Sequence, residues 1–387
     1  MNNILTTTPL SLYIHIPWCT RKCPYCDFNS YEVKAAPIEN YIEAMISDLK
    51  QDSVRVANRP LLSIYIGGGT PSLLSAKTFD KLLTAIRNIF DFGKNIEISI
   101  EANPGTIDKQ KCIDYKNIGI NRLSLGVQSF QDDKLFSLGR IHNAQVALET
   151  INYALDAGFD NLNIDIMFGI PGQTLEDAIF DVNKAISLNV PHISWYQLTI
   201  EPKTPFYTNP PVLPNEDVIM KIRTAGHKLF EEHKYKQYEV SAYCKAKKYQ
   251  CKHNVNYWEF GDYLGVGAGA HGKITDLAAK KIIRTAKKAN PDDYLTADKM
   301  SLSLLAEERV MTEKELPVEF MMNALRLYRD IPISLFTERT GLSVDVIMEN
   351  LKKAEELKLI KLNDKKITTT KKGKEFLNDL LEIFANI

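Results

Sequence analysis

The sequence predicts an α/β fold: a partial (β/α)6 barrel followed by a C-terminal α+β region that ends in a winged-helix-like domain. Six short apolar or β-branched runs are each followed by a longer stretch with helical periodicity, a pattern typical of repeated βα units around a parallel sheet. Glycine and polar residues gather where the predicted strands end. After about residue 304 the pattern changes to helices and a short hairpin.

The repeated units can be placed along the chain. The predicted strands are Leu12–Ile16, Leu62–Ile66, Ile96–Ile100, Arg122–Val127, Leu162–Phe168 and Ile193–Thr199. The predicted helices are Pro37–Gln51, Ala76–Phe90, Asp108–Asn117, Ala144–Ala157, Leu175–Leu188 and Glu216–His233. The winged-helix-like part comprises predicted helices at Ser334–Thr340 and Ser343–Leu357 and a hairpin at Ile360–Thr370.

The chain of 387 residues is long enough for two or three domains. We predict a barrel over residues 1–236, a connecting segment over 237–303 and a helical, winged-helix-like domain over 304–387. The connecting segment carries the motifs HNxxYW and GAGAHG, and from 237 to 273 it has no clean period. Because six units are fewer than the eight of a closed barrel, we expect later sequence to supply part of the missing wall.

The composition argues against several classes of protein. The 48 basic residues balance 48 acidic ones, and 13 basic residues face 12 acidic ones from Lys314 to Ile387, so the basic excess of a nucleic-acid-binding protein is absent. No apolar run reaches the roughly 20 residues that span a bilayer, and the first residues lack the features of a leader peptide. Six cysteines are too few for a disulfide framework. A cytoplasmic protein is expected.

Three cysteines lie close together in a loop after the first predicted strand. Cys19, Cys23 and Cys26 form the spacing CxxxCxxC. Cysteine thiolates hold iron–sulfur clusters, and three ligands leave one iron of a [4Fe–4S] cluster open. Zinc is the alternative, but structural zinc needs a fourth ligand. His15 is the nearest candidate, and it lies on the strand before the loop.

The cysteine loop and the strand end Gly67-Gly68-Gly69-Thr70-Pro71 together resemble the radical-SAM superfamily. The resemblance implies that the amino and carboxyl groups of S-adenosylmethionine (SAM) chelate the open iron. It also implies an electron donor for the cluster, whose electron cleaves SAM to methionine and a 5′-deoxyadenosyl radical. Glycines suit this position because a residue without Cβ lets backbone approach a ligand closely.

Within the superfamily the chain resembles the oxygen-independent coproporphyrinogen dehydrogenase family, and more closely its branch of heme chaperones. The resemblance runs over nearly the whole length. The segments that carry it are HIPWC, CPYCDFNS, IYIGGGTPS, EANPGT, RLSLGVQSF, LGRIH, NIDIMFGIPGQT, YQLTIEPKTPF, HNVNYW, DYLGVGAGAHG and FMMNALRL.

The resemblance implies a set of SAM-binding residues in this chain. They supply backbone close to the ligand, carboxylates that accept from amino or hydroxyl groups, and a guanidinium that pairs with a carboxylate. The set is Tyr13, Gly68, Gly69, Thr70, Glu101, Gln128, Arg140 and Asp165. No residue is assigned a catalytic role.

Two departures separate the chain from the dehydrogenases. Their loop has a further cysteine two positions beyond the third, where this chain has Phe28. They also have a long N-terminal arm, whereas about ten residues precede the first predicted strand here.

Within HNxxYW, His253 is the candidate heme contact, because imidazole is a common axial ligand and aromatic side chains can flank a macrocycle. His271 and Cys251 are weaker candidates.

The sequence therefore predicts a chaperone that binds heme and transfers it to acceptors such as respiratory hemoproteins, with a [4Fe–4S] cluster and SAM as cofactors. A radical decarboxylase of coproporphyrinogen III is the first alternative, and a tRNA-modifying radical-SAM protein is the second. The balanced charge disfavours tRNA. The residues leave open whether SAM is cleaved.

Overall fold

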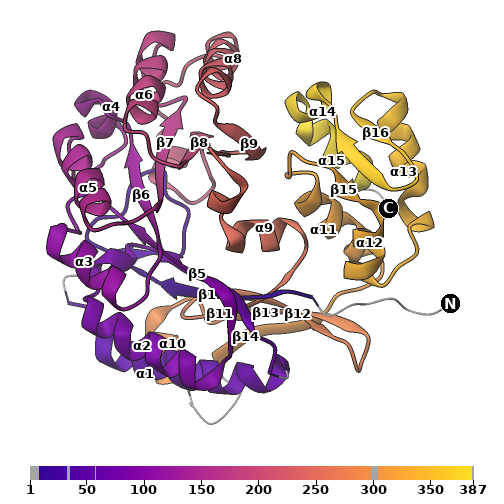
Figure 1. Cartoon of the computed structure of the whole chain (residues 1–387), viewed down its shortest axis with the longest axis horizontal. Coiled ribbons are helices and arrows are strands. Elements are labelled where there is room, and N and C mark those ends of the chain that lie inside the picture. Colours follow the sequence, from indigo (N-terminus) through magenta and orange to yellow (C-terminus); the bar gives the residue numbers. More distant parts are fainter. Residues whose placement is uncertain (1–7, 33–34, 57, 298–303, 386–387) are drawn as a thin grey trace.

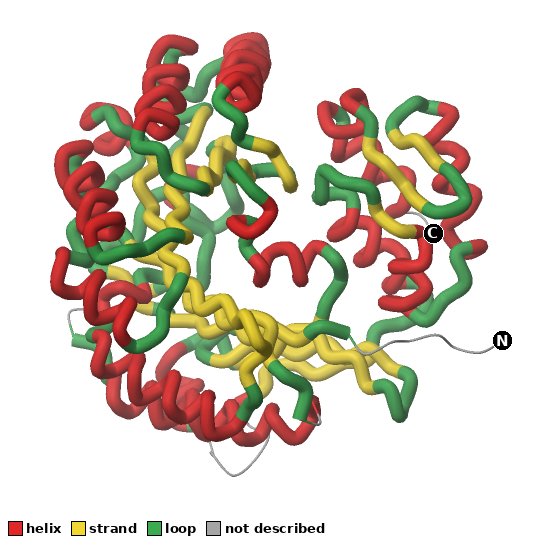
Figure 2. The backbone as a smooth tube through the Cα atoms, viewed as in Figure 1, coloured by secondary structure: helices red, strands yellow, loops and turns green. Residues whose placement is uncertain are grey.

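The computed structural model describes residues 8–32, 35–56, 58–297 and 304–385. Six parallel strands form the barrel wall and lie next to one another in chain order. Helices cover their outer side (Figures 1 and 2). The strands are β1 (Leu10–Ile16), β4 (Leu61–Gly68), β5 (Phe92–Ala102), β6 (Arg122–Gln128), β7 (Asn161–Phe168) and β8 (His192–Gln197). The predicted partial barrel is confirmed.

Five of the helices after the barrel strands begin at a short polar residue that caps them. Asp108, Asn143 and Asn215 each accept from the backbone N–H three residues ahead, and Thr174 forms a reciprocal capping box with Asp177. Such caps satisfy N–H groups that the first turn leaves without partners. The helices are α1 (Ile38–Ser53), α2 (Ala76–Ile89), α3 (Lys109–Asn117), α4 (Asp132–Ser137), α5 (Ala144–Asp156), α6 (Leu175–Ser187) and α8 (Glu216–Glu232).

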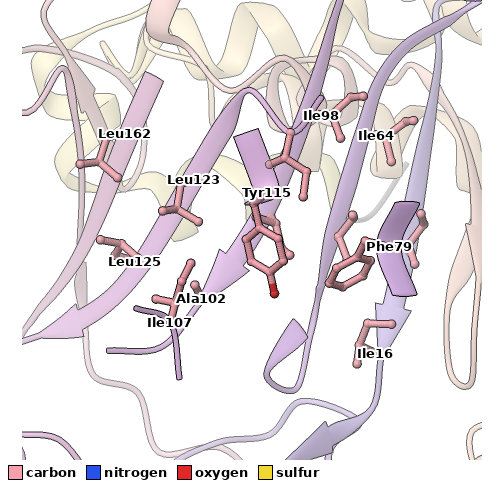
Figure 3. Packing of buried hydrophobic residues seen from close by; sticks show 14 of the residues in the cluster. Ile16, Ile64, Phe79, Ile98, Ala102, Ile107, Tyr115, Leu123, Leu125 and Leu162 are labelled. Atoms are coloured by element: carbon pink, nitrogen blue, oxygen red, sulfur yellow. The ribbon is translucent and has the colours of Figure 1, made fainter. Parts of the chain in front are cut away.

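Side-chain alternation separates the two faces of the barrel wall. On β6, Leu123 and Leu125 join the apolar layer between strands and helices, where Leu162 of β7 and Tyr115 of α3 also lie (Figure 3). Because successive side chains on a strand point to opposite faces, Arg122 and the other alternate residues of β6 point into the barrel. The interior wall is therefore polar, while the outer face carries the hydrophobic core.

The sheet extends at both ends beyond the six units. Next to β1 lie β11 (Asp262–Val266), which is parallel to it, and then the antiparallel strands β12 (His271–Asp276), β13 (Lys281–Lys287) and β14 (Leu305–Val310). Next to β8 lie β10 (Ala242–Cys244) and β9 (Lys236–Glu239). Short helices α9 (Lys252–Trp258) and α10 (Pro291–Thr296) lie between these strands in the chain.

The structure differs here from the irregular course expected for residues 237–273. The segment includes β10, β11, most of β9 and the start of β12, all strands of the main sheet, and its helical parts are α9 and a short 3-10 turn at Lys247–Tyr249. The strands escaped prediction because they show no alternation: all five residues of β11 are buried, as expected of a strand covered on both faces. As expected, later sequence extends the barrel wall.

The C-terminal region has its own hydrophobic core and a three-stranded sheet in the order β15-β17-β16. This agrees with the predicted winged-helix-like architecture. Its elements are α11 (Glu315–Ala324), β15 (Ile331–Pro332), α12 (Ile333–Thr340), α13 (Asp345–Glu356), β16 (Ile360–Leu362), β17 (Lys366–Thr369), α14 (Lys371–Glu375) and α15 (Leu377–Ala385). In Figure 1, α9 lies between the barrel and this region.

Candidate functional site

A cavity of about 470 Å³ lies inside the barrel, a size typical of small-molecule sites. Its wall is built from alternate residues along the full lengths of β6, β7 and β8. The cysteine loop and the ends of β4 and β5 complete it. The wall residues from the three strands are Arg122, Ser124, Gly126, Gln128, Asn163, Asp165, Met167, His192, Ser194, Tyr196 and Gln197, the last being the end of β8.

The cysteine loop joins two short paired strands, β2 (Trp18–Cys19) and β3 (Tyr31–Glu32). All three cysteines of the CxxxCxxC motif line the cavity. A turn closes between two of them, with the Cys26 N–H donating to the Cys23 carbonyl at 3.1 Å. The Lys22 ammonium donates to the carbonyls of Phe28 and Ser30 at 2.9 and 3.1 Å. The returning half of the loop is thereby fixed.

The arrangement of the three thiols fits an iron–sulfur cluster better than a single metal ion. Burial raises the pKa of Cys19 and Cys26, which favours the neutral thiols. Arg140 donates to the Cys23 sulfur at 3.5 Å. Over the described residues, no three His, Cys, Asp or Glu side chains converge on a point that could hold one metal ion. A cluster differs, because each cysteine binds a separate iron.

The glycines at the end of β4 lie where a side chain would clash. Gly68 has φ +112°, and a Cβ there would lie 2.5 Å from the His15 ring. A Cβ on Gly69 would lie 2.6 Å from the Trp18 carbonyl oxygen. The backbone of Thr70 donates to that same carbonyl at 2.8 Å. The strand end therefore packs directly against the cysteine loop and exposes its backbone to the cavity.

Glu101 is a buried carboxyl group of the cavity whose pKa is strongly shifted. The Tyr65 hydroxyl donates to its Oε1 at 2.7 Å, and the Gly68 N–H approaches its Oε2 at 3.2 Å. Burial, together with neighbouring Asp165, raises the pKa of Glu101 to about 7 against these hydrogen bonds. A cationic ligand would relieve this cost, since an opposite charge favours the carboxylate.

Asp165 and Gln128 accept hydrogen bonds from neighbouring side chains. Asp165 accepts from Asn163 at 2.8 Å and from Ser124 at 3.2 Å, and burial raises its pKa. Gln128 has φ +69°, a left-handed conformation that is uncommon for a residue with a side chain. The Tyr196 hydroxyl donates to its side-chain oxygen at 2.7 Å.

Arg140 connects the cavity wall with the cysteine loop. One guanidinium nitrogen donates to the Asn103 side chain at 2.7 Å and to the Gly126 carbonyl at 2.8 Å. Its Nε is buried and has no hydrogen-bond partner. Arg140 lines the cavity, where its guanidinium can pair with an acidic group of a ligand.

The structure brings together most of the predicted site. The three cysteines line the cavity, and so do seven of the eight residues predicted to bind SAM: Gly68, Gly69, Thr70, Glu101, Gln128, Arg140 and Asp165. Tyr13 does not line it. Its hydroxyl donates to His15 Nδ1 at 2.9 Å, while His15 Nε2 bonds to the Asn29 carbonyl at 2.8 Å. Tyr13 thus contacts the loop through His15.

His253 also lies outside the cavity lining. Its imidazole is only 9% exposed and packs against Tyr65 and Tyr13, with ring centroids 5.1 and 6.0 Å away. Burial lowers its pKa to about 4. The neighbouring residue Asn254 does line the cavity, so α9 forms part of the barrel interior.

Several cavity residues were missed by the search for polar strand ends. Arg122, Asn163 and His192 lie at or near the beginnings of their strands, and Tyr65 lies within β4. Alternation could have found them, because small or polar residues of β6 occupy every second position from Arg122 to Gln128. A wall of this kind indicates a polar interior along the whole barrel depth.

Comparison with known proteins gives the class. The Radical SAM superfamily model matches residues 13–184, and the HemN C-terminal domain model matches residues 311–376. The solved coproporphyrinogen III oxidase (HemN) from Escherichia coli aligns with a TM-score of 0.82 over 98% of this chain and 90% of that one, at 23% identity. This likeness shows a shared fold. The chain is a radical-SAM protein.

Curated relatives give the particular family. The heme chaperone HemW of Haemophilus influenzae is 48% identical over 97% of this chain and 98% of its own length. The HemW proteins of Escherichia coli and Bacillus subtilis are 45% and 34% identical, each over 97% of this chain and 98% of their own lengths. The chain belongs to the HemW family of heme chaperones, which confirms the resemblance found in the sequence.

Within the described part of the chain, no helix is long and apolar enough to span a bilayer.

Proposed function

We propose that this protein binds heme and transfers it to heme-accepting proteins such as respiratory hemoproteins, and that it carries a [4Fe–4S] cluster and SAM. The observation that carries this proposal is the 48% identity to a heme chaperone over nearly the full length of both chains. The six free cysteines of the described residues suit a reducing compartment, so we place the activity in the cytoplasm.

Cys19, Cys23 and Cys26 would hold the cluster. Their common exposure to one cavity and the absence of a convergent single-ion site among the described residues support a cluster over zinc. Metal ligation would require deprotonation of thiols whose pKa burial raises. Binding of the cluster would therefore release protons.

SAM would lie in the cavity beside the open iron. Seven of the predicted residues line the cavity there. Glu101 and Asp165 would accept from its amino or hydroxyl groups, and the guanidinium of Arg140 would pair with a carboxylate. When bound, the cluster and SAM supply one-electron chemistry that an external electron donor starts.

The heme contact of His253 stays a prediction. A neutral imidazole is suited to ligating iron, and the low pKa of His253 keeps it neutral. An iron could reach this buried ring only if α9 shifted, because Tyr65 and Tyr13 pack against it. The substitution His253→Ala tests the contact.

The experiment is a hemin titration of anaerobically reconstituted protein, followed by absorbance and repeated with an apo-hemoprotein as acceptor. Saturable binding and transfer to the acceptor are expected. The same sample is incubated with SAM, a reductant and coproporphyrinogen III. The absence of saturable hemin binding, or the appearance of a vinyl-bearing product, would refute the proposed function.

A further inference from the structure

The helix that carries HNxxYW is fixed to the inside of the barrel by three hydrogen bonds. Glu97 of β5 accepts from the Lys252 N–H at 2.9 Å, at the first turn of α9. The Asn256 side chain donates to Ser11 Oγ of β1 at 3.0 Å and to the carbonyl of Asp262 at 2.9 Å. Because both halves of this short helix are tied to strands, His253 between them has a defined position.

That position places the His253 ring against Tyr65. The two rings are 5.1 Å apart with an interplanar angle of 28°. Nδ1 of His253 is buried and has no hydrogen-bond partner. The imidazole therefore acts here as a flat ring, and this nitrogen contributes no bond that would fix a neighbour.

Tyr65 transmits the contact to the cavity. It lines the cavity, and its hydroxyl donates to Glu101 Oε1 at 2.7 Å. The other oxygen of Glu101 accepts from the Gly68 backbone at 3.2 Å. The orientation of the Glu101 carboxylate thus depends on the orientation of the Tyr65 ring, against which His253 packs without lining the cavity itself.

We infer that His253 is a positioning residue of the SAM site, whose ring holds Tyr65 and, through Tyr65, the carboxylate of Glu101. This inference rests on the proposed function, because it takes the cavity as the SAM site. It gives the histidine of HNxxYW a role that needs no contact with iron. The requirement is for a planar ring of this size, since Nδ1 makes no bond.

The test compares SAM binding by His253→Ala and His253→Phe. SAM affinity is measured by calorimetry on anaerobically reconstituted protein, with cluster content and thermal unfolding recorded for each variant. His253→Ala should weaken SAM binding by about tenfold, as when a hydrogen bond to a charged group is lost. His253→Phe should restore it to within about twofold, because packing tolerates a volume-conserving ring.

Two further variants complete the test. Tyr65→Phe keeps the ring but removes the hydroxyl bonded to Glu101, so it should weaken SAM binding as His253→Ala does. His227→Ala is the matched control: His227 packs against Trp195 at 5.8 Å and bonds to the Tyr243 hydroxyl, and it does not line the cavity. Its removal should leave SAM affinity unchanged.

Any other pattern of SAM affinities among these variants overturns the inference. Unchanged SAM binding in His253→Ala would exclude support through the ring, and equal losses in the alanine and phenylalanine variants would show that the imidazole nitrogens matter. Unchanged SAM binding in Tyr65→Phe would show that the Tyr65 hydroxyl does not connect His253 to Glu101. A loss of SAM affinity in His227→Ala equal to that in His253→Ala would indicate a general packing effect. If the unmodified protein binds hemin but no SAM, the proposed SAM site falls, and this inference with it.

Discussion

Two groups of buried polar side chains in the same sheet differ in how their carboxylates are paired. On the flank beside β1, Asp262 of β11 accepts from Arg59 at 2.9 Å, from Lys273 at 2.8 Å and from the Thr275 backbone at 2.9 Å. Nearby, the Lys287 ammonium lies 2.5 and 2.8 Å from the carboxylates of two residues of α1, Asp48 and Asp52.

The cavity wall is different. An arginine Nε is buried without a partner in both groups, at Arg59 on the flank and at Arg122 and Arg140 in the wall, so the difference lies in the carboxylates. The flank carboxylates form ion pairs with its own cations, whereas Glu101 and Asp165 of the wall accept from neutral donors. Burial raises the pKa of Glu101 to about 7, and a cationic ligand would favour its charged form.

The largest effect should come from the cysteines. Cys23→Ser should abolish the visible absorbance and the paramagnetic signal of a reconstituted cluster while leaving the fold intact, because Cys23 lies in a loop at the cavity and not in the core. Cys112→Ser, on α3 in the hydrophobic core, is the control and should retain the cluster. Full cluster content in Cys23→Ser would contradict the assignment.

The second-largest effect should be a loss of stability when a buried ion pair of the flank is broken, compared with a substitution on the exposed surface. Asp262→Ala leaves Lys273 buried without its partner, so the free energy of unfolding should fall by about 3–5 kcal/mol. Urea unfolding of the cluster-free chain measures it. Asp293→Ala, an exposed position on α10, should change the free energy of unfolding by less than about 0.5 kcal/mol. Equal losses at both positions would remove the distinction between flank and surface.

A pH effect of intermediate size is expected at Glu101. Its pKa of about 7 means that the ligand-free group is protonated below this pH, whereas the positively charged sulfonium of SAM favours the carboxylate. SAM affinity should therefore fall by up to tenfold per pH unit below about 7, and Glu101→Gln should lose this dependence. Calorimetry between pH 6 and pH 8.5 would check this, with Glu201→Gln at the cavity lining as control.

The same group has an opposite effect on the ligand-free fold. Its folded pKa lies above the unfolded value of about 4.3, so Glu101 favours folding at low pH. That contribution is lost as the pH rises from about 4.3 to about 7. In the calorimetric experiment, an affinity for SAM that falls with rising pH would contradict the role of the Glu101 carboxylate as an acceptor for SAM.

The smallest effect should be at Phe28, which replaces the further cysteine of the dehydrogenases and is 58% exposed. Phe28→Ala should leave cluster content unchanged and alter the free energy of unfolding by less than about 0.5 kcal/mol. Cluster absorbance and urea unfolding provide the measurements. Loss of the cluster would mean that the side chain itself holds the loop closed.

The sequence predicted the six parallel strands because each is an apolar run followed by a stretch with helical periodicity. It also predicted most of the cavity, since Glu101 and Asp165 belong to segments quoted for the family resemblance. It did not predict β11, whose burial on both faces removes alternation. Nor could it place His253, because a motif specifies residue types and not which neighbour a ring will meet.

The two ends of the twelve-stranded sheet have a consequence for solubility. The outer strand β14 carries Glu307, Glu308 and Arg309, and charges of this kind discourage edge-to-edge pairing with another molecule. The other outer strand, β9, receives a hydrogen bond of 2.9 Å from the Tyr328 N–H to Tyr238 and a bridge between Glu239 and Leu327. The C-terminal region thus caps an edge that would otherwise be open to aggregation.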